Sequence, residues 1–494
     1  MLTVVIRGSF SEAKSAIHEA NRRGEAIEFR LDLFDDLSHV SKLKGLCSLP
    51  VIFTLRKKSQ GGAFEGNERE REEKLIELLA LNPDYVDLEY DCDPTFVQKV
   101  RKMFPDVAII CSFHDFEKTP ENLGIIFEKI SNMRAAIYKM ATFANSSLDS
   151  LRMLTFIQSQ RKNEKNVAGM CMGMNGEITR ILAPIVDNLL TYASLSSEQE
   201  TAPGQVSLDI LEKIYHTSRL NRQTAIYALI GDPVDKSIGH LAHNHFFEKL
   251  KLDAVYVKIA IKSGEVSEFF HLIKQLPFKG FSVTMPLKEE VSAHLDSVAP
   301  KAKSMGAINT LVLTEGKWEG FNTDAEGALD AIETKGKVSG KKIVILGAGG
   351  AARALAFESM QRGGEVLIIN RTKAKAERIA KQLGCEGVSL EEWQMLPFDI
   401  LMNTTPVGME AQSSESLITE DSIPSDATVF DAVIKPKETY LLNIAKNKGC
   451  QVVYGYEMFA RQAIKQFKLW FNQPFEEGNL LQDIDQIYHE EMSS

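Results

Sequence analysis

The sequence predicts an α/β protein that begins with a (β/α)8 barrel and continues with an α/β part made of two subdomains. The chain has 494 residues, which is enough for two or three domains. Up to about residue 218, short apolar runs alternate with segments of helical periodicity, a pattern typical of a parallel sheet. The polar stretch 216–224 lacks periodicity and is interpreted as a linker. We therefore expect a barrel over 1–218, a subdomain over 225–325 that is completed by C-terminal helices within 456–494, and a second subdomain over 326–455.

The composition excludes several classes of protein. The chain is 44% hydrophobic and 25% charged, and its net charge of −10 comes without a basic block. These values argue against nucleic acid or an anionic membrane as a partner. No apolar run approaches the ~20 residues of a membrane-spanning helix, and the first residues lack the features of a signal peptide. The six cysteines include no Cys-x-x-Cys pair, which favours a reducing, cytoplasmic compartment over disulfides or structural zinc.

Eight strand candidates lie in the first part of the chain: Thr3–Arg7, Ala26–Asp32, Val51–Arg56, Tyr85–Tyr90, Ala108–His114, Ala136–Ala141, Asn166–Met172 and Leu190–Leu195. Helical patterns such as 68–81 and 120–131 separate them, and eight such units indicate a closed barrel. Polar residues cluster where these strands end, at Glu28, Arg30, Arg56, His114 and Lys139. In such a barrel the carboxyl ends of the strands form the catalytic face.

The second part of the chain has its own strand pattern. Four candidates belong to the first subdomain: Tyr227–Gly231, Ala254–Lys258, Gly280–Thr284 and Asn309–Leu313. Five belong to the second: Lys341–Leu346, Val366–Ile369, Ile400–Asn403, Val429–Ala432 and Val452–Tyr454. The tail 457–470 has helical spacing, and we expect it to pack back onto the first subdomain.

Lys139 is the most informative residue of the first part. It lies in the apolar run Ala135–Ala141, so we expect its amine to be desolvated and its ammonium form to be disfavoured. A neutral amine is the nucleophile that forms an imine with a ketone. The alternative is a lysine at the end of a strand with its amine in water. His114 could act as acid and base, and the nearby arginines suit an anionic substrate that carries a ketone.

Six motifs at the predicted barrel face occur in a characteristic order. They are Glu28-Phe29-Arg30-Leu31-Asp32, Thr54-Leu55-Arg56, Ser112-Phe113-His114-Asp115-Phe116, Lys139, Thr179-Arg180 and Thr201-Ala202-Pro203-Gly204-Gln205. Over residues 1–215 the chain resembles the type I 3-dehydroquinate dehydratases. The resemblance implies that Lys139 forms a Schiff base with 3-dehydroquinate and that His114 removes the proton next to the imine. It also implies a set of substrate-binding residues: Glu28, Arg30, Arg56, Arg180, Thr201 and Gln205.

One departure from this family concerns the histidine. Gln60-Gly61-Gly62 stands where the family usually has Glu-Gly-Gly. A glutamine can keep a hydrogen bond but not the charge of the glutamate, so we expect His114 to be less basic than in relatives. Thr201 replaces a usual serine, which keeps the hydroxyl group.

A glycine-rich turn follows the strand Lys342–Leu346. Gly347-Ala348-Gly349-Gly350-Ala351-Ala352 fits Gly-x-Gly-x-x-Ala between a strand and a helix, which is the dinucleotide-binding pattern of a Rossmann-type domain. Its glycines let the backbone approach a pyrophosphate, and the helix N-terminus favours the negative charge. The next strand ends in Asn370-Arg371-Thr372, where an arginine and no acidic residue is found. This favours the 2′-phosphate of NADP over NAD, the alternative being a solvent-facing arginine.

Further motifs extend this pattern to residues 225–475. They are Ser282-Val283-Thr284-Met285-Pro286-Leu287-Lys288, Gly306-Ala307-Ile308-Asn309-Thr310, Gly320-Phe321-Asn322-Thr323-Asp324, Asn403-Thr404-Thr405-Pro406-Val407-Gly408-Met409, and Gly455-Tyr456-Glu457-Met458 with Gln462. This region resembles the shikimate dehydrogenases. The resemblance implies that Lys288 and Asp324 are the catalytic pair and that Ser237, Thr284, Asn309 and Gln462 contact substrate. It implies an NADP site formed by Gly347, Gly349, Gly350, Ala351, Asn370, Arg371, Thr372, Thr404 and Gly455.

Three departures concern the choice of substrate. The Ser-x-Ser of the family appears as Ser237-Ile238-Gly239, Ile434 stands where a tyrosine is expected, and Ser282 replaces a usual asparagine. In this family a glycine at the second serine accompanies the use of quinate, whereas the retained Thr284 favours shikimate. We expect shikimate as the main product, with weak oxidation of quinate. A structural salt bridge is the alternative for Lys288 and Asp324.

His240, His243 and His245 suggest a metal site at first sight. Positions 240 and 243 share a helical face that 245 does not, and no carboxylate or cysteine partner accompanies them, so we predict no metal.

Two consecutive activities in one chain are therefore the main hypothesis, because the product of the dehydratase is the substrate of the dehydrogenase. One alternative is a non-catalytic sensor of the same metabolites, supported by Gln60, Gly239 and Ile434. Another is a catabolic enzyme that uses quinate. The sequence leaves the oligomeric state open.

Overall fold

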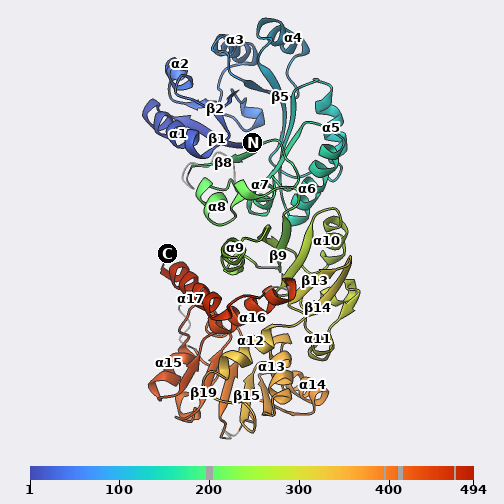
Figure 1. The fold of residues 1–494 in the computed structure, drawn as a ribbon, viewed down its shortest axis with the longest axis vertical. Coiled ribbons are helices and arrows are strands. Elements are labelled where there is room, and N and C mark those ends of the chain that lie inside the picture. The colour runs from blue at the N-terminus through green and yellow to red at the C-terminus, as the bar shows by residue number, and fades with distance from the viewer. Residues whose placement is uncertain (196–203, 394–396, 410–414, 472–473, 494) are drawn as a thin grey trace. The chain divides into compact units, whose positions relative to one another are not determined.

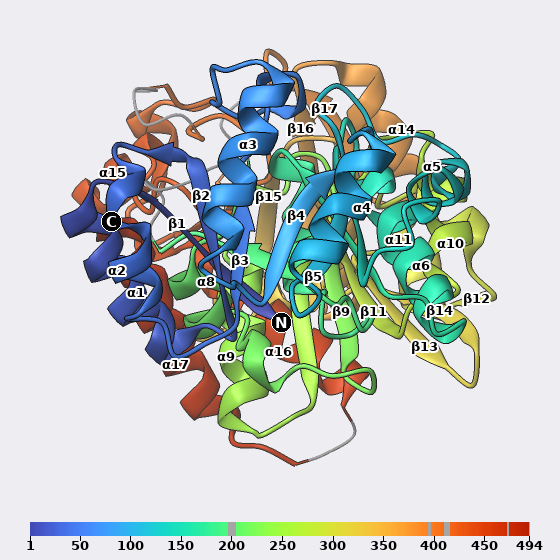
Figure 2. The same cartoon turned by 90° about the horizontal axis from the view of Figure 1, so that it is seen from above.

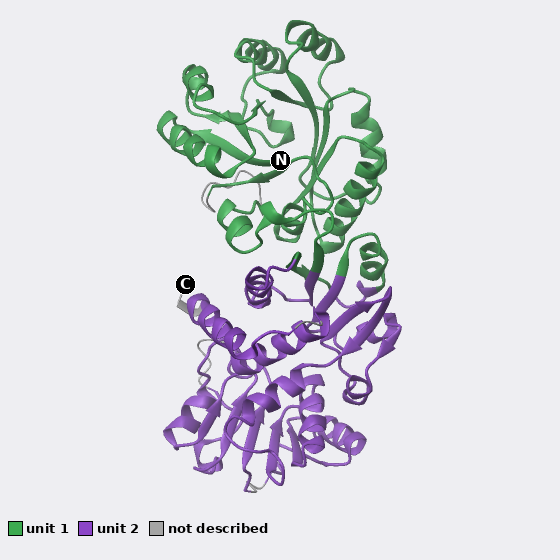
Figure 3. Ribbon diagram, viewed as in Figure 1, with its two compact units in different colours: residues 1–226, 253–261, 267–278 green, residues 227–252, 262–266, 279–494 purple. Residues whose placement is uncertain are grey.

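The computed structural model describes residues 1–195, 204–393, 397–409, 415–471 and 474–493. The chain forms two compact units, one of residues 1–226, 253–261 and 267–278, the other of residues 227–252, 262–266 and 279–494 (Figure 3). Within the described residues, no helix is long and apolar enough to cross a membrane. The predicted α/β class is confirmed, since three sheets alternate with helices throughout the chain (Figure 1).

The first unit contains the predicted eight-stranded parallel barrel. Its strands are β1 (Leu2–Gly8), β2 (Ala26–Phe34), β3 (Val51–Thr54), β4 (Tyr85–Glu89), β5 (Ala108–Asp115), β6 (Ile137–Phe143), β7 (Val167–Met172) and β8 (Thr191–Ala193). They follow the order β7-β6-β5-β4-β3-β2-β1-β8, so β8 pairs with β1 and the sheet is nearly closed. All eight predicted strands are confirmed. Parallel pairing brings the ends of the strands together at one rim, where the predicted site residues lie.

Helices cover the outside of the barrel strands, as Figures 1 and 2 show for α1, α3 and α4. The helices of this part are α1 (Phe10–Arg23), α2 (Val40–Lys44), α3 (Glu68–Leu79), α4 (Pro94–Met103), α5 (Leu123–Ser131), α6 (Ser147–Lys162), α7 (Ile178–Ile181) and α8 (Leu208–Lys213). Helix α1 illustrates the local cause. Ser9 and Glu12 form a reciprocal capping box at its start, and Ala13, Ile17 and Ala20 are buried at helical spacing.

The barrel interior changes from apolar to charged towards the carboxyl ends of the strands. Val5, Ile52, Ile110 and Ala168 belong to one buried apolar cluster. In β4 the side chains alternate, so Asp87 and Glu89 share one face, and both are buried. Buried charges must be paired to be tolerated, and this requirement shapes the first site.

The second sheet is mixed and has the order β10-β9-β11-β13-β14-β12. Its strands are β9 (Ala225–Gly231), β10 (Ala254–Ala260), β11 (Phe278–Val283), β12 (Ser297–Val298), β13 (Thr310–Thr314) and β14 (Lys317–Phe321), accompanied by α9 (Gly239–Lys249), α10 (Val266–Ile273), α11 (Pro300–Met305) and α12 (Asp324–Ile332). The four predicted strands are confirmed. Strands β12 and β14 were not predicted, because β12 has two residues and β14, the second strand of the hairpin with β13, has only one buried residue.

The third sheet is parallel and has the order β17-β16-β15-β18-β19-β20, the Rossmann order. Its strands are β15 (Lys342–Leu346), β16 (Glu365–Asn370), β17 (Glu386–Ser389), β18 (Ile400–Asn403), β19 (Thr428–Asp431) and β20 (Gln451–Val453), with α13 (Gly350–Gln361), α14 (Lys373–Leu383), α15 (Tyr440–Asn447), α16 (Gly455–Trp470) and α17 (Glu477–Ser493). Apolar clusters lie on both faces of the sheet. The predicted Rossmann-type fold is confirmed, although the polar edge strand β17 was missed.

Candidate active sites

Lys139 is buried at the carboxyl-terminal rim of the barrel. Its side chain is 6% exposed, and its Nζ atom donates a hydrogen bond to Oδ2 of Asp87 at 3.0 Å. Oε1 of Glu28 lies 3.6 Å from the same nitrogen, and the Tyr192 ring centre lies 4.1 Å from it. The alternative of an amine in water is therefore wrong, because the amine is buried among Asp87, Glu28 and Tyr192. These three residues are called the lysine cage below.

The carboxylates of β4 are fixed by arginine. Arg56 holds Asp87 with two hydrogen bonds of 2.9 and 2.8 Å, and it donates a third, of 2.7 Å, to the Ser112 hydroxyl. That hydroxyl in turn donates to Asp87 at 2.5 Å. Such a bidentate pair fixes the orientation of the carboxylate, so Asp87 presents one oxygen to Lys139.

The charge state expected for Lys139 was wrong. Burial alone lowers the pKa of this amine, as we expected, but Asp87, Tyr192 and Glu28 together outweigh it, so the pKa is raised above its ordinary value. The resting residue is an ammonium ion. The same carboxylates would stabilise a protonated imine formed at this nitrogen, because the iminium carries the same charge in the same place.

His114 has the opposite environment. Burial, and then the charges of Arg56 and Lys139, push its pKa well below the ordinary value, with only Asp87 opposing them. Its Nδ1 atom is buried and has no hydrogen-bond partner among the described residues. The imidazole is thus a neutral base beside a charged lysine. The ring of Phe116 stacks against it, with ring centres 6.1 Å apart.

The other barrel residues that were predicted to bind substrate have different surroundings. Glu28 accepts a hydrogen bond of 2.8 Å from Thr54 within the cage. Arg30 is instead held by Asp32 in a bidentate pair of 3.0 and 2.7 Å. Arg180 is buried and donates to the Cys171 carbonyl at 2.5 Å. Gln205 is also buried, whereas Thr201 lies outside the described residues.

The second predicted site centres on a close ion pair. Nζ of Lys288 lies 2.5 Å from Oδ2 of Asp324, and both side chains are partly exposed, at 26% and 15%. Asp324 begins helix α12, and the backbone carbonyl of Lys288 accepts from the Ile308 amide at 2.7 Å. The structure therefore brings together two residues that are 36 positions apart and leaves them accessible to a ligand.

A buried amide network lies beside this pair. Asn309 accepts from the Thr323 amide at 2.8 Å and donates to the Gln462 side chain at 3.4 Å. Gln466, one helical turn after Gln462, donates to the Asn309 carbonyl at 3.0 Å and accepts from Ser282 at 2.8 Å. Since Thr323 precedes Asp324, this network fixes the start of α12 and with it the carboxylate.

The remaining predicted substrate residues are placed by backbone contacts. The Ser237 hydroxyl accepts from the Gly239 amide at 3.1 Å, and Gly239 begins helix α9. Thr284 packs against Gly231, where a Cβ atom would come within 2.4 Å of the threonine methyl group. Among the described residues, neither Ser237 nor Thr284 forms a hydrogen bond with Lys288 or Asp324. Their role in binding substrate stays a prediction.

No group of three or more histidine, cysteine or carboxylate side chains within the described residues could hold a metal ion. His243 is buried, and burial lowers its pKa to about 3.

Comparison with known proteins agrees with both sites. The family model of type I 3-dehydroquinase matches residues 2–222. The model of the shikimate dehydrogenase substrate binding domain matches residues 229–311, and that of shikimate / quinate 5-dehydrogenase matches residues 330–428. A bifunctional 3-dehydroquinate dehydratase/shikimate dehydrogenase of Arabidopsis thaliana, named as chloroplastic, is 34% identical over 93% of this chain and 79% of its own. A shikimate biosynthesis protein AroDE of Chlamydia pneumoniae is 35% identical over 95% of both chains.

The chain belongs to the bifunctional 3-dehydroquinate dehydratase/shikimate dehydrogenase family. A solved structure of a shikimate dehydrogenase in complex with NADP+ is 34% identical, with a TM-score of 0.51, and covers 54% of this chain and 97% of its own. The two predicted resemblances are thus confirmed for the family and its fold.

The residues predicted for the family's cofactor fit a dinucleotide. Gly347 has a φ of +115°, and a Cβ atom there would meet the Thr404 hydroxyl at 2.5 Å. A Cβ atom at Gly349 would meet nothing within 4 Å, which leaves room in front of helix α13 for a pyrophosphate. Gly455 is required for packing, because its Cβ would lie 2.3 Å from the Val433 carbonyl. Gly350 and Ala351 form the first turn of α13.

The turn after the neighbouring strand β16 also fits NADP. Asn370 donates to the Thr372 carbonyl at 3.0 Å, which shapes the turn after β16. Arg371 is exposed on this turn and forms no ion pair among the described residues, so its guanidinium is available for a phosphate.

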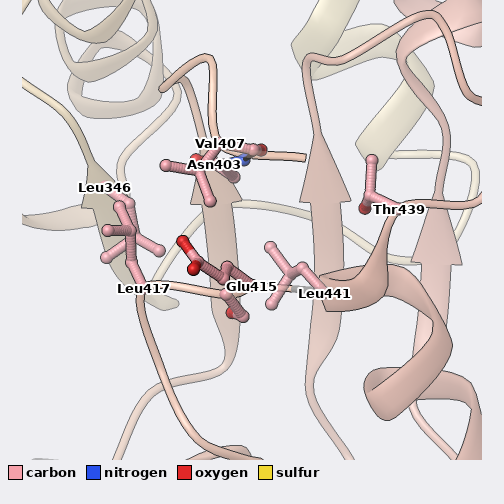
Figure 4. A pocket seen from close by; sticks show the side chains of 8 residues that line it. Leu346, Asn403, Val407, Glu415, Leu417, Thr439 and Leu441 are labelled. Atoms are coloured by element: carbon pink, nitrogen blue, oxygen red, sulfur yellow. Dashed lines mark hydrogen bonds between the residues drawn. The ribbon is translucent and has the colours of Figure 1, made fainter. Parts of the chain in front are cut away.

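A small pocket lies at the carboxyl edge of this sheet, between the ends of β15 and β18 (Figure 4). Leu346, Asn403, Val407, Thr439 and Leu441 line it with residues 415–417. Ligands bind at this switch point in open α/β sheets. Asp431 anchors its wall: it accepts hydrogen bonds from Asn403 and Thr439, and burial raises its pKa to about 6.

Four buried residues of these sites were missed from the sequence: Asp87, Glu89, Arg71 and Gln466. Asp87 and Glu89 had a readable signal, because two acidic residues at alternate positions of a short apolar strand share its buried face. Gln466 follows Gln462 at helical spacing on one face of α16. Arg71 had no signal, because it stands among seven charged residues in the segment 68–74.

Replacing Gln60 by glutamate is expected to raise the pKa of His114. Oε1 of Gln60 is buried without a hydrogen-bond partner among the described residues, and the Gly61 backbone lies against Phe116, the ring that stacks on His114. A charge added there favours imidazolium, whereas a base must be neutral, so the acidic limb of the dehydratase rate should move up by about one pH unit. Rates of wild type and Gln60→Glu, measured from pH 5 to 9, check this; superimposable profiles contradict it.

Proposed function

We propose that this protein dehydrates 3-dehydroquinate to 3-dehydroshikimate in its barrel and reduces that product to shikimate with NADPH in its C-terminal part. The observation that carries the proposal is the environment of Lys139. A lysine buried between Asp87 and Glu28, beside a neutral histidine, suits imine chemistry and has no evident structural purpose. The chain belongs to a family with both activities.

The dehydration requires the ammonium of Lys139 to lose a proton first. His114 is the neutral base in the same cage and can accept it. The amine then adds to the substrate ketone, and His114 gives its proton to the hydroxyl of this adduct, which leaves as water. The product is a protonated imine that Asp87 and Glu28 stabilise, and His114 is neutral again. His114 removes a proton from the carbon beside the imine and returns it to the departing hydroxyl group. Hydrolysis of the imine releases the enone and restores Lys139, so the net loss is one water.

Arginines hold the substrate's carboxylate and hydroxyl groups in this proposal. Arg30 and Arg180 carry guanidinium groups that the bidentate geometry of a carboxylate suits. Arg56 is already engaged by Asp87 and Ser112, so we assign it mainly to the positioning of Asp87.

The reduction uses Lys288 and Asp324. When bound, NADPH supplies the hydride to the ketone carbon. Lys288 donates a hydrogen bond and then a proton to the oxygen that becomes the alcohol, and Asp324 keeps the ammonium aimed at that oxygen. Asn309 and Gln462 orient the ring hydroxyls from the buried network beside the pair. Gly347, Gly349, Gly350, Ala351, Asn370, Arg371, Thr372, Thr404 and Gly455 form the proposed NADP site.

Several further assignments belong to the proposal. The domains are 1–218, 225–325 completed by 456–494, and 326–455. All six cysteines are free thiols, which supports a cytoplasmic location. Small molecules are the partners, and neither nucleic acid nor a membrane is required.

A coupled assay tests the proposal against a non-catalytic sensor. The purified protein is given 3-dehydroquinate and NADPH. We expect shikimate to form with one NADPH oxidised per molecule, whereas binding of both ligands without turnover would establish the sensor.

The reverse reaction tests the substrate preference. Reduction of NADP+ is compared with shikimate and with quinate, which carries an extra hydroxyl at the carboxylate carbon. Thr284 is retained, so shikimate should react faster, with kcat/KM at least about tenfold higher. Gly239 in place of a serine leaves room for the extra hydroxyl, so weak quinate oxidation is expected. A clear preference for quinate would instead establish the catabolic alternative.

A further inference from the structure

We infer that Arg71 is a positioning residue of the dehydratase: it compensates the buried carboxylate of Glu89, so that the Arg56 guanidinium can hold Asp87 against Lys139. The inference rests on the dehydratase activity proposed above. It assigns a function to a helix residue that does not touch the reacting lysine.

The burial of Arg71 is exceptional for its position. Helix α3 begins with a run of charged residues, most of them exposed, yet Arg71 is 0% exposed. Its Nη1 atom lies 3.0 Å from Oε2 of Glu89 and donates to the Leu55 carbonyl at 2.9 Å. Nη2 reaches Glu68, at the protein surface, at 2.5 Å. A buried guanidinium is expensive to desolvate unless it is paired, so these contacts fix it in one place.

Positively and negatively charged side chains alternate between Arg71 and the Nζ atom of Lys139. Glu89 is also 3.5 Å from Arg56, which holds Asp87 at 2.8 Å, and Asp87 lies 3.0 Å from Lys139. Three cations thus alternate with three carboxylates, the last being Glu28 at 3.6 Å from Lys139. All six are 5% exposed or less. In such a setting the removal of one charge cannot be screened by water and must be compensated by its neighbours.

Loss of the Arg71 charge should change the electrostatic environment of Lys139. Among the described cations, Arg56 would then be the one left in an ion pair with Glu89, with Lys57 acting at longer range, so Arg56 would be drawn from Asp87 towards Glu89. Asp87 would be less neutralised, so it would favour the charged forms of both Lys139 and His114, whose pKa values it raises. The neutral imidazole that acts as the base would then be available only at higher pH. The groups that face Lys139 are Asp87 on β4, Glu28 on β2, Tyr192 on β8, His114 on β5 and Arg56 just after β3, and none of them is changed.

A purely structural role predicts something different. If Arg71 only attaches α3 to the barrel, its loss lowers the melting temperature and leaves the pH dependence of the remaining activity unchanged. The position of the acidic limb therefore separates the two roles.

The experiment compares four variants with wild type. Arg71→Gln removes the charge but keeps a donor for the Leu55 carbonyl, and Arg71→Lys keeps the charge. The double variant Arg71→Gln/Glu89→Gln removes both members of the pair. Arg161→Leu is the matched control, because Arg161 bonds Asp187 at 3.0 Å elsewhere in the same unit. For each, dehydratase kcat/KM is measured from pH 5.5 to 9.5, and the imine is trapped with borohydride.

We expect Arg71→Gln to move the acidic limb up by about one pH unit, which corresponds to about tenfold less activity on the limb. Arg71→Lys and the double variant should restore the limb, and Arg161→Leu should leave it in place. An unmoved limb in Arg71→Gln, or a limb that stays displaced in the double variant, overturns the inference. If Arg71→Gln does not fold, an acidic limb that is displaced in Arg71→Lys or in the double variant overturns the inference instead. Absence of a trapped imine in wild type would instead refute the dehydratase activity itself.

Discussion

Replacing Lys139 by alanine is expected to abolish the dehydratase and to spare the dehydrogenase. The side chain supplies the nitrogen of the imine, and no other lysine among the described residues lies in the cage of Asp87, Glu28 and Tyr192. Removing a covalent nucleophile typically costs on the order of 10⁴-fold or more in kcat. The measurement is the loss of water from 3-dehydroquinate, with NADPH-dependent reduction of 3-dehydroshikimate by the same preparation as the internal reference.

Borohydride trapping makes the result specific to one nitrogen. Treatment of wild type with borohydride and 3-dehydroquinate, followed by peptide mapping, should place the reduced adduct on Lys139, and Lys139→Ala should show none. Lys129→Ala is the matched control, because Lys129 also lies over a tyrosine ring, 5.3 Å from the centre of Tyr90, but at an exposed helical position. An adduct at another lysine, or substantial activity in Lys139→Ala, would contradict the assignment.

The residues of the first site that could be predicted lie at the carboxyl ends of strands. Lys139 and His114 were found because parallel strands bring their carboxyl ends to one rim, and the register pairs Ser112 with Lys139 and His114 with Ala141. The charge of Lys139 was not predictable in the same way. Burial was correctly inferred from the apolar run, but the sign of the shift depends on Asp87, which is 52 residues away in sequence.

The fold shows the same division. Strands with continuous apolar runs, such as β15 and β18, were predicted almost to the residue, because both of their faces are buried. Strands β14 and β17 were missed, because each has only one buried residue and therefore no such run. Gln466 was missed for a related reason: a buried amide is defined by its partners, Asn309 and Ser282, and these lie on other elements.

Replacing Lys288 by methionine should remove most of the dehydrogenase activity while the dehydratase stays intact. Methionine keeps the length of the side chain but neither donates a hydrogen bond nor carries a proton. Loss of a group that stabilises the developing alkoxide and transfers its proton typically costs about 10² to 10⁴-fold, and we expect about 10³-fold in kcat. Because Asn309 and Gln462 are unchanged, KM for 3-dehydroshikimate should rise far less than kcat falls. Steady-state kinetics with varied substrate at saturating NADPH give both quantities.

A neighbouring ion pair distinguishes this catalytic role from a structural salt bridge. Lys301 bonds Glu326 at 2.7 Å, and Glu326 lies in the same first turn of α12 as Asp324. If the Lys288–Asp324 pair only anchors this helix, Lys301→Met and Lys288→Met should have comparable, small effects on kcat. Exposed pairs contribute at most about 1 kcal/mol to stability, so neither variant should unfold the protein. A kcat for Lys288→Met within about threefold of that for Lys301→Met would show that Lys288 takes no part in the reaction. A large, selective fall in kcat requires that its ammonium act on the oxygen that receives the proton.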